Sequence, residues 1–136
     1  MTLSKTYAAH LDAVQAQNAR IYGPSPTGDA WGGASPRRFR FDPHRDLDRN
    51  IEVIASYVGP EDVVIDVGGG AGRVCLPLAL KCKIALNVEP SPGMGAEFES
   101  LAQEAGIRNA RLVPSSLAEA QAPQGDISFT ADVTYF

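Results

Sequence analysis

The strongest constraint in the sequence is an apolar run that breaks abruptly into glycines. Residues 63–67 form a nearly continuous run of valine and isoleucine, the pattern of a strand buried on both faces. Four glycines follow closely, at Gly68, Gly69, Gly70 and Gly72. The apolar residues of segment 74–80 then predict a helix. This order predicts a nucleotide-binding corner, because glycine lets a ligand approach the backbone and a helix N-terminus presents free N–H groups.

The spacing of these glycines narrows the kind of ligand. The fingerprint of dinucleotide-binding folds, G-x-G-x-x-G, needs a third glycine or alanine at position 73, where this chain has Arg73. The glycines instead fit Gly68-x-Gly70-x-Gly72, and Asp66 lies near the end of the preceding strand. A tight strand-to-helix turn that binds no ligand can have the same pattern, so this alternative stays open.

A second acidic residue follows the next predicted strand. Residues 84–88 form that strand, and Glu89 comes 19 residues after Gly70. A carboxylate at the tip of the second strand can accept hydrogen bonds from both hydroxyls of a ribose, which selects a nucleoside. The spacing suits more than one nucleoside cofactor, and a solvated surface charge is the other interpretation of Glu89.

The whole chain alternates helices with strands, which predicts the α/β class. The remaining expected elements are helices at 3–21, 42–57, 71–81 and 91–105, a loop at 23–36, and strands at 111–113 and 126–130. We expect a helical cap and loop at 1–58 and an incomplete α/β core at 59–136. The first helix is interpreted as a cover over the core. Trp31 in the loop either closes over a ligand or fills the edge of the core.

Composition and charge exclude several classes of protein. The 136 residues suffice for one domain with one core. The net charge of −4 argues against a protein built mainly to bind nucleic acid. No apolar run approaches the roughly 20 residues of a membrane span, and residues 1–5 lack the apolar core of a signal peptide. We therefore expect a cytoplasmic protein with no membrane partner.

The two cysteines are expected to be buried, unreactive thiols. Cys75 and Cys82 share one predicted helix and its final turn, which separates them by roughly 10 Å, too far for a disulfide. A metal site needs more ligands than His10 and His44 can add, so no metal is predicted.

Two segments resemble a known family. Residues 64–73 resemble motif I of the class I S-adenosylmethionine (SAM)-dependent methyltransferases, D-x-G-x-G-x-G, and residues 87–94 are similar to the acidic motif after the family's second strand. The resemblance implies a three-layer, Rossmann-like fold with a parallel sheet, and SAM as the cofactor. It implies that the glycines line the methionine part of SAM and that Glu89 holds the ribose. The implied cofactor-binding residues are Asp66, Gly68, Gly69, Gly70, Gly72, Glu89, Pro90, Ser115, Ser116, Leu117 and Ala131.

The chain departs from the family pattern in three places. Ser115 and Ser116 stand where many members have an aspartate that accepts the adenine amino group. Only four of the family's seven strands are present, which predicts the order 3-2-1-4, a sheet truncated after the fourth strand, and homo-oligomers formed through that exposed apolar edge at 127–136. The Asn-Pro-Pro-Tyr motif of some members is absent, so no catalytic residue is assigned. Asp132 and Tyr135 either face the methyl group or are ordinary strand-end residues.

These observations predict a SAM-dependent methyltransferase domain that acts on an unidentified small molecule. The alternative is a non-catalytic fragment of the same fold that self-associates or needs a partner chain. An oxidoreductase that uses NAD(P) is disfavoured by Arg73.

Overall fold

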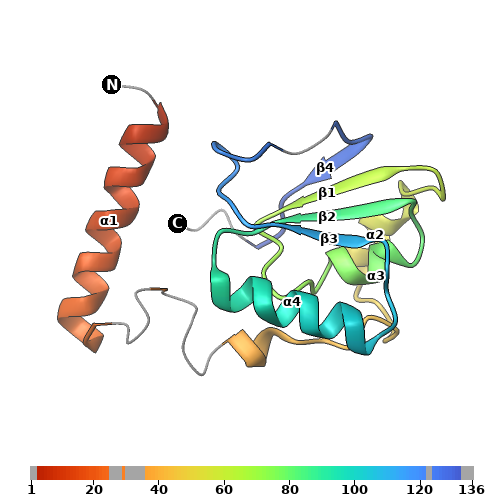
Figure 1. The fold of residues 1–136 in the computed structure, drawn as a ribbon, viewed down its shortest axis with the longest axis horizontal. Helices are drawn as coiled ribbons and strands as arrows, with labels where there is room; N and C mark the ends of the chain where they lie inside the picture. The colour runs from red at the N-terminus through yellow and green to blue at the C-terminus, as the bar shows by residue number, and fades with distance from the viewer. Residues whose placement is uncertain (1–2, 25–28, 30–35, 122–123, 133–136) are drawn as a thin grey trace.

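The computed structural model describes residues 3–24, 29, 36–121 and 124–132 (Figure 1). Its elements in chain order are α1 (Leu3–Tyr22), the 3-10 helix η1 (Pro36–Phe39), α2 (Arg49–Ser56), β1 (Val63–Val67), α3 (Cys75–Ala79), β2 (Ile84–Val88), α4 (Pro92–Glu104), β3 (Ala110–Val113) and β4 (Ile127–Phe129). Figure 1 shows one sheet with α2, α3 and α4 on one side of it, and α1 beside this body. Trp31 and Tyr135, which the sequence singled out, lie outside the described residues.

The four strands form a parallel sheet in the order β3-β2-β1-β4, which confirms the order expected from the sequence. Val64 of the central strand β1 lies opposite Ala85 of β2 and Ile127 of β4. The connections from β1 to β2 and from β2 to β3 run in the same direction across the sheet. Right-handed crossovers therefore place their helices, α3 and α4, on the same face. All four strands end at one edge, where the site is built.

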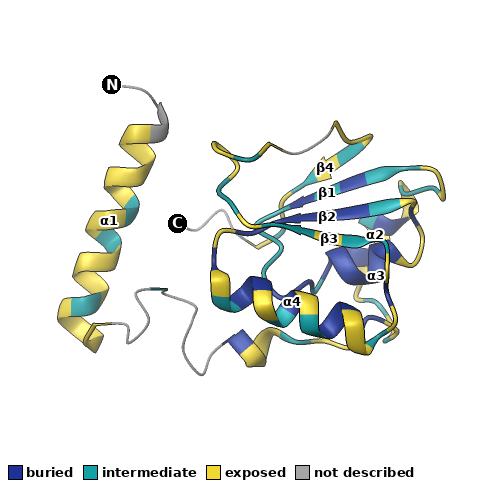
Figure 2. Cartoon of the chain, viewed as in Figure 1, coloured by how far each residue is buried: buried dark blue, intermediate teal, exposed yellow. Residues whose placement is uncertain are grey.

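The core lies between this helical layer and the sheet. Its buried members come from α2, α3, α4, β1 and β2, and they include Ile51, Val64, Leu76, Ala85 and Phe98 (Figure 2). Strands β3 and β4 contribute partly buried residues, Ala110, Leu112 and Phe129. On the opposite face, Gly125 approaches the sheet so closely that an added Cβ would lie 2.8 Å from the Ile65 side chain. Of the three layers expected, the described residues contain the sheet and one helical layer.

Both cysteines of the chain belong to this core. Cys75 begins α3 and Cys82 follows its end, and both are buried, free thiols, as the sequence predicted. Burial raises the pKa of each thiol, because the thiolate would lose its hydration. The described residues contain no cluster of three metal-ligating side chains. None of the described helices is long and apolar enough to cross a membrane.

Side-chain caps decide where α2 begins. The sequence predicted a helix from Asp42, but α2 starts only after Asp48, whose carboxylate accepts hydrogen bonds from the N–H groups of Asn50 and Ile51 at 3.1 and 3.2 Å. Upstream, the carboxylate of Asp42 accepts a hydrogen bond from the His44 N–H at 2.9 Å. Asp42 therefore closes a turn, and the start of the predicted helix was wrong.

The next two helices also follow local chemistry. The helix predicted over residues 71–81 is shorter, since residues 70–74 form turns and α3 covers Cys75–Ala79. Ser91 caps α4 as predicted, because its hydroxyl oxygen accepts a hydrogen bond from the Met94 N–H at 3.2 Å and Pro92 occupies the first helical position.

Helix α1 is present as predicted, but most of its apolar side chains are not buried. Tyr7 and Ile21 are 52% and 60% exposed, whereas Leu11 and Val14 are partly covered. Figure 2 shows the helix mostly in the colour of exposed residues. Its role as a cover over the core stays a prediction.

Candidate functional site

The glycine turn lies at the carboxyl end of β1, and its backbone conformation requires glycine. Gly68, Gly70 and Gly72 have φ angles of 74°, 55° and 91°, a left-handed region that other residues rarely adopt. Among the described residues, a Cβ on Gly70 would meet only the sulfur of Met94, at 3.8 Å. A Cβ on Gly72 would lie 2.7 Å from side-chain carbons of the core. Gly70 therefore leaves the backbone open to a ligand, whereas Gly72 lets the turn pack on the helices.

Gly69 meets two buried oxygen atoms. A Cβ there would lie 2.5 Å from Oδ1 of Asn87 and 2.7 Å from Oδ2 of Asp66. Asp66 and Asn87 are register partners at the ends of β1 and β2, and they are 1% and 0% exposed. Neither oxygen has a hydrogen-bond partner in the described part of the chain. A buried oxygen without a hydrogen bond lowers the free energy of unfolding by about 1–3 kcal/mol. The fold nevertheless keeps two such acceptors beside the turn.

The contacts around these side chains fix their orientation. Asn87 Nδ2 donates a hydrogen bond to the carbonyl oxygen of Gly70 at 2.8 Å, so Asn87 Oδ1 is turned toward Gly69 and Asp66. Burial, together with the negative charge of Glu89, raises the pKa of Asp66 to about 7, although a hydrogen bond from the Cys75 backbone lowers it. Asp66 therefore changes its protonation state near neutral pH.

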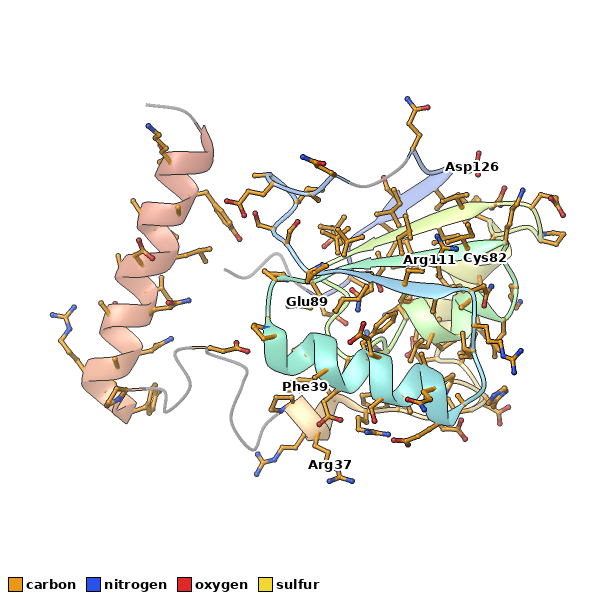
Figure 3. All side chains as sticks on the ribbon, viewed as in Figure 1. Arg37, Phe39, Cys82, Glu89, Arg111 and Asp126 are labelled. Carbon is orange, nitrogen blue, oxygen red and sulfur yellow. The ribbon has the colours of Figure 1, made fainter. Side chains whose placement is uncertain are left out.

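Glu89 connects the tip of β2 to the glycine turn. Its Oε2 accepts a hydrogen bond from the Gly70 N–H at 2.9 Å, and its Oε1 accepts one from the Ser91 N–H at 2.8 Å. Figure 3 shows Glu89 at the carboxyl edge of the sheet, next to the start of α4. Burial raises its pKa, while the two backbone N–H groups lower it. Each oxygen keeps further acceptor capacity, so a ligand with two hydroxyls could bind here. Pro90, the next residue, is exposed.

The other predicted residues follow β3 and β4 at the same edge. The Ser115 hydroxyl donates to the carbonyl oxygen of Ser116 at 3.0 Å, and the Ser116 hydroxyl donates to Glu119 at 3.0 Å. Both hydroxyl oxygens can still accept a hydrogen bond. Leu117 is 64% exposed, and Ala131 is partly buried against the core. The structure thus brings Asp66, the glycine turn and Glu89 together. The two serines, Leu117 and Ala131 lie after the ends of the neighbouring strands β3 and β4.

Two residues of this site were not predicted. Asn87 had a usable signal, because it is the only polar residue in the apolar strand 84–88. Asp29 had none, because it lies in a loop rich in glycine and proline. Its Oδ2 accepts hydrogen bonds from the Ser91 hydroxyl and from the Gly93 N–H, both at 2.9 Å.

Arg73 ties the end of the turn to neighbouring elements. Its guanidinium pairs with Asp48 at 3.2 Å and with Asp132. Its carbonyl oxygen accepts a hydrogen bond from Arg45 at 3.0 Å. Asp132 has a φ of 60°, which is uncommon for a residue other than glycine. Arg73 therefore links the segment after β4 to the start of α2.

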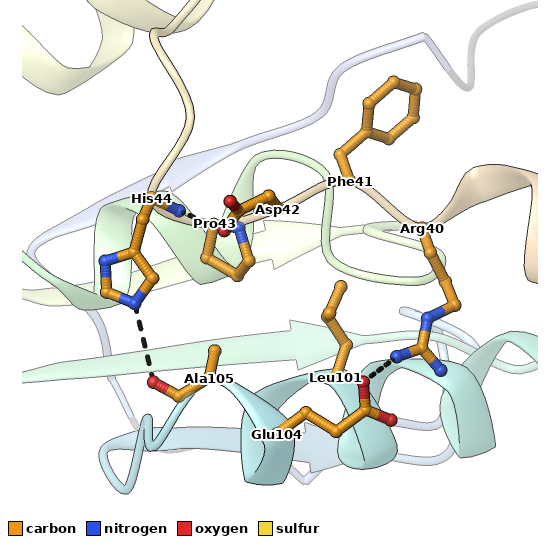
Figure 4. A pocket seen from close by; sticks show the side chains of 8 residues that line it. All are labelled: Arg40, Phe41, Asp42, Pro43, His44, Leu101, Glu104 and Ala105. Atoms are coloured by element: carbon orange, nitrogen blue, oxygen red, sulfur yellow. Dashed lines mark hydrogen bonds and ion pairs between the residues drawn. The ribbon is translucent and has the colours of Figure 1, made fainter.

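A hollow lies elsewhere, between the segment after η1 and the second half of α4 (Figure 4). Arg40 on its wall pairs with Glu97 at 2.9 Å and with Glu104. His44 Nε2 lies 3.5 Å from the carbonyl oxygen of Ala105. None of the predicted cofactor residues lines this hollow, and its arginine is held in ion pairs with two glutamates, so we assign it to packing.

Several solved structures share the arrangement of strands and helices. Magnesium protoporphyrin IX methyltransferase from Synechocystis PCC 6803, with bound SAM, has a TM-score of 0.61 and 18% identity over 76% of this chain and 58% of that chain. Precorrin 8W decarboxylase from Methanobacterium thermoautotrophicum has a TM-score of 0.55 and 25% identity over 63% of this chain and 50% of that chain. Coclaurine N-methyltransferase, bound to N-methylheliamine and S-adenosylhomocysteine, has a TM-score of 0.52 and 18% identity over 68% of this chain and 30% of that chain. No protein-family model and no curated protein sequence matches the chain.

The chain has the Rossmann-like fold of the class I SAM-dependent methyltransferases, as the sequence predicted. It aligns with 36% of the YcgJ protein from Bacillus subtilis, 30% of a dimethyladenosine transferase from Plasmodium falciparum and 50% of the precorrin decarboxylase. The chain therefore spans about a third to a half of the length of these proteins. A shared fold does not define a substrate.

Proposed function

We propose that the chain binds SAM at the carboxyl edge of its sheet and serves methyl transfer to a small molecule. The observation that carries this proposal is the pairing of Glu89 with the Gly70 N–H at 2.9 Å. This contact brings an acidic group at the tip of β2 against an open glycine turn at the tip of β1. Such a pair of features suits a ligand that has a ribose and a second, elongated part.

The residues present fit SAM. Glu89 would accept hydrogen bonds from the ribose hydroxyls, and the open backbone at Gly70 would adjoin the methionine part. The unpartnered Oδ2 of Asp66 offers an acceptor in the same corner. Ser115 and Ser116 would accept from the adenine amino group, through bonds weaker than those to a carboxylate.

When bound, SAM supplies a methyl group attached to a sulfonium. The chain's own part is to hold the cofactor and orient it, since methyl transfer depends mainly on in-line alignment with the nucleophile. The carboxylate of Asp132 pairs with Arg73, so we assign no general base. The net charge of −4 supports a small-molecule acceptor over nucleic acid.

Calorimetry with the whole 136-residue chain tests the proposal. We expect SAM and S-adenosylhomocysteine to bind with micromolar affinity. Glu89→Ala should weaken both about a hundredfold, through the loss of two hydrogen bonds to a charged group. Glu99→Ala, an exposed glutamate of α4, is the matched control and should leave the affinity unchanged. NAD should not bind. A folded wild-type chain that binds neither adenosyl ligand would refute the proposal.

The second candidate function is association with another chain through β4. This three-residue strand pairs with β1 on one side and forms the edge of the described sheet. Edge strands offer unpaired N–H and C=O groups to a second chain. A second copy of this chain is the proposed partner, and Ser128→Lys, on the exposed position of β4, should weaken the self-association. Light scattering that gives a monomer at every concentration would refute this function.

A further inference from the structure

The carboxylate of Asp29 connects the segment before η1 to the candidate site. Asp29 accepts two hydrogen bonds on one oxygen, Oδ2, from the Ser91 hydroxyl and from the Gly93 N–H, each at 2.9 Å. Gly93 lies in the first turn of α4, where backbone N–H groups have no partner within the helix. Asp29 thereby joins the chain before η1 to the start of α4.

Ser91 connects Asp29 to Glu89. Its N–H donates to Glu89 Oε1 at 2.8 Å, its hydroxyl donates to Asp29, and its hydroxyl oxygen accepts from the Met94 N–H at 3.2 Å. Ser91 is 6% exposed, so water competes little for these bonds. With all three bonds made, Ser91 holds one orientation, and that orientation sets the position of one Glu89 oxygen.

We infer that Asp29 is a positioning residue, which orients the Glu89 carboxylate toward the ribose hydroxyls through Ser91. The inference rests on the proposed function, because it concerns the carboxylate that would hold the ribose. Loss of Asp29 frees the Ser91 hydroxyl to rotate and leaves the Gly93 N–H without this acceptor. The Glu89 carboxylate then keeps its bond to Gly70 but loses a fixed direction at its other oxygen.

The charge of Asp29 acts in addition to its hydrogen bonds. Burial is the main cause of the raised pKa of Glu89, and the negative charge of Asp29 raises it further. Asp66 is a second carboxyl group that interacts with Glu89. Position and charge can therefore be separated by a variant that keeps the acceptor oxygen but removes the charge.

The test compares two ligands, S-adenosylhomocysteine and its analogue without the two ribose hydroxyls. In the wild-type chain the hydroxyls should contribute about a hundredfold in affinity, as expected for two hydrogen bonds to a charged group. In Asp29→Ala the ratio of the two affinities, S-adenosylhomocysteine over its analogue, should fall to about tenfold. The analogue itself should bind within about twofold of its wild-type affinity. A general structural defect would weaken both ligands equally. An unchanged ratio in Asp29→Ala would overturn the inference.

Two variants serve as controls. Asp29→Asn keeps an acceptor oxygen for both hydrogen bonds and should preserve the wild-type ratio. If it behaves as Asp29→Ala does, the positioning role is wrong and the effect is electrostatic. Asp12→Ala removes an exposed carboxylate from α1 and should preserve the ratio as well.

Hydrogen exchange tests the contact without any ligand. The Gly93 amide should exchange at least about tenfold faster in Asp29→Ala than in the wild type or in Asp29→Asn, since loss of one hydrogen bond has about that effect. Equal exchange in all three proteins would overturn the inference. If neither ligand binds the wild type while Gly93 exchange responds to Asp29, the proposed function fails and the contact stands.

Discussion

Replacing Asp66 by asparagine should stabilise the protein at neutral and alkaline pH. Asp66 is 1% exposed, and burial raises its pKa to about 7. Ionisation therefore places a charge in the core, beside the unpartnered Oδ1 of Asn87. Asparagine has the same shape, cannot ionise, and offers an amide N–H group toward that oxygen.

The size of the effect follows from the shift in the pKa of Asp66. An aspartate of the unfolded chain has a pKa of about 3.9. Between the two values, the folded protein holds a proton that the unfolded chain has released. The contribution of Asp66 to the free energy of unfolding is therefore highest below about pH 4 and falls as the pH rises to about 7. Each pH unit in this window costs up to about 1.4 kcal/mol, so the wild type should lose about 3 kcal/mol between about pH 5 and about pH 8 that Asp66→Asn retains.

Urea unfolding followed by circular dichroism measures this effect. The quantity to plot against pH is the difference in unfolding free energy between Asp66→Asn and the wild type, because other groups then cancel. Asp12→Asn removes an exposed carboxylate of α1 and should change the unfolding free energy by less than about 0.5 kcal/mol. A difference for Asp66→Asn that stays constant across this pH range would refute the assignment of a buried, neutral Asp66.

Two further substitutions test the packing around the site. Gly69→Ala should destabilise the protein by about 2 kcal/mol or more, because the added Cβ would lie 2.5 Å from Oδ1 of Asn87. Gly59→Ala, whose Cβ would have no described neighbour nearer than 3.4 Å, is its control, and equal urea midpoints would contradict the reasoning. Asn109→Ala should cost about 1–3 kcal/mol, since Nδ2 donates to three carbonyl groups at and after the end of α3, at 2.7, 3.0 and 3.3 Å. Thermal unfolding measures this loss, with Asn18→Ala, at an exposed position of α1, as the control. Equal stability of the two variants would contradict the prediction.

The sheet and the main corner of the site could be predicted because local sequence determines them. A valine and isoleucine run allows little except a buried strand, and a cluster of glycines directly after it indicates a turn with left-handed angles, which Gly68 and Gly70 adopt. The position of Glu89 at the tip of β2 follows once the strand is recognised. These features depend on neighbours in the sequence, so a single sequence suffices to find them.

The rest of the site depends on contacts between distant segments. Asp29 reaches Ser91 across 62 positions of the chain, and nothing in the composition of its loop indicates that contact. The start of α2 was misplaced because Asp42 and Asp48 are equally good caps by residue type, and only the fold decides between them. Asn87 could have been recognised as a polar residue in an apolar strand, but the direction of its amide depends on Gly70.

The burial of Cys75 and Cys82 has a practical consequence for spectroscopy. A thiol reacts through its thiolate, and burial both hides these two sulfur atoms and disfavours that form. The chain contains no other cysteine, so its native background of maleimide labelling should be slow. A cysteine introduced at Leu117, which is 64% exposed on the turn after β3, would carry a fluorophore beside the proposed adenine region. Such a labelled protein would report adenosyl ligands by fluorescence and make the binding experiments possible at nanomolar protein concentration.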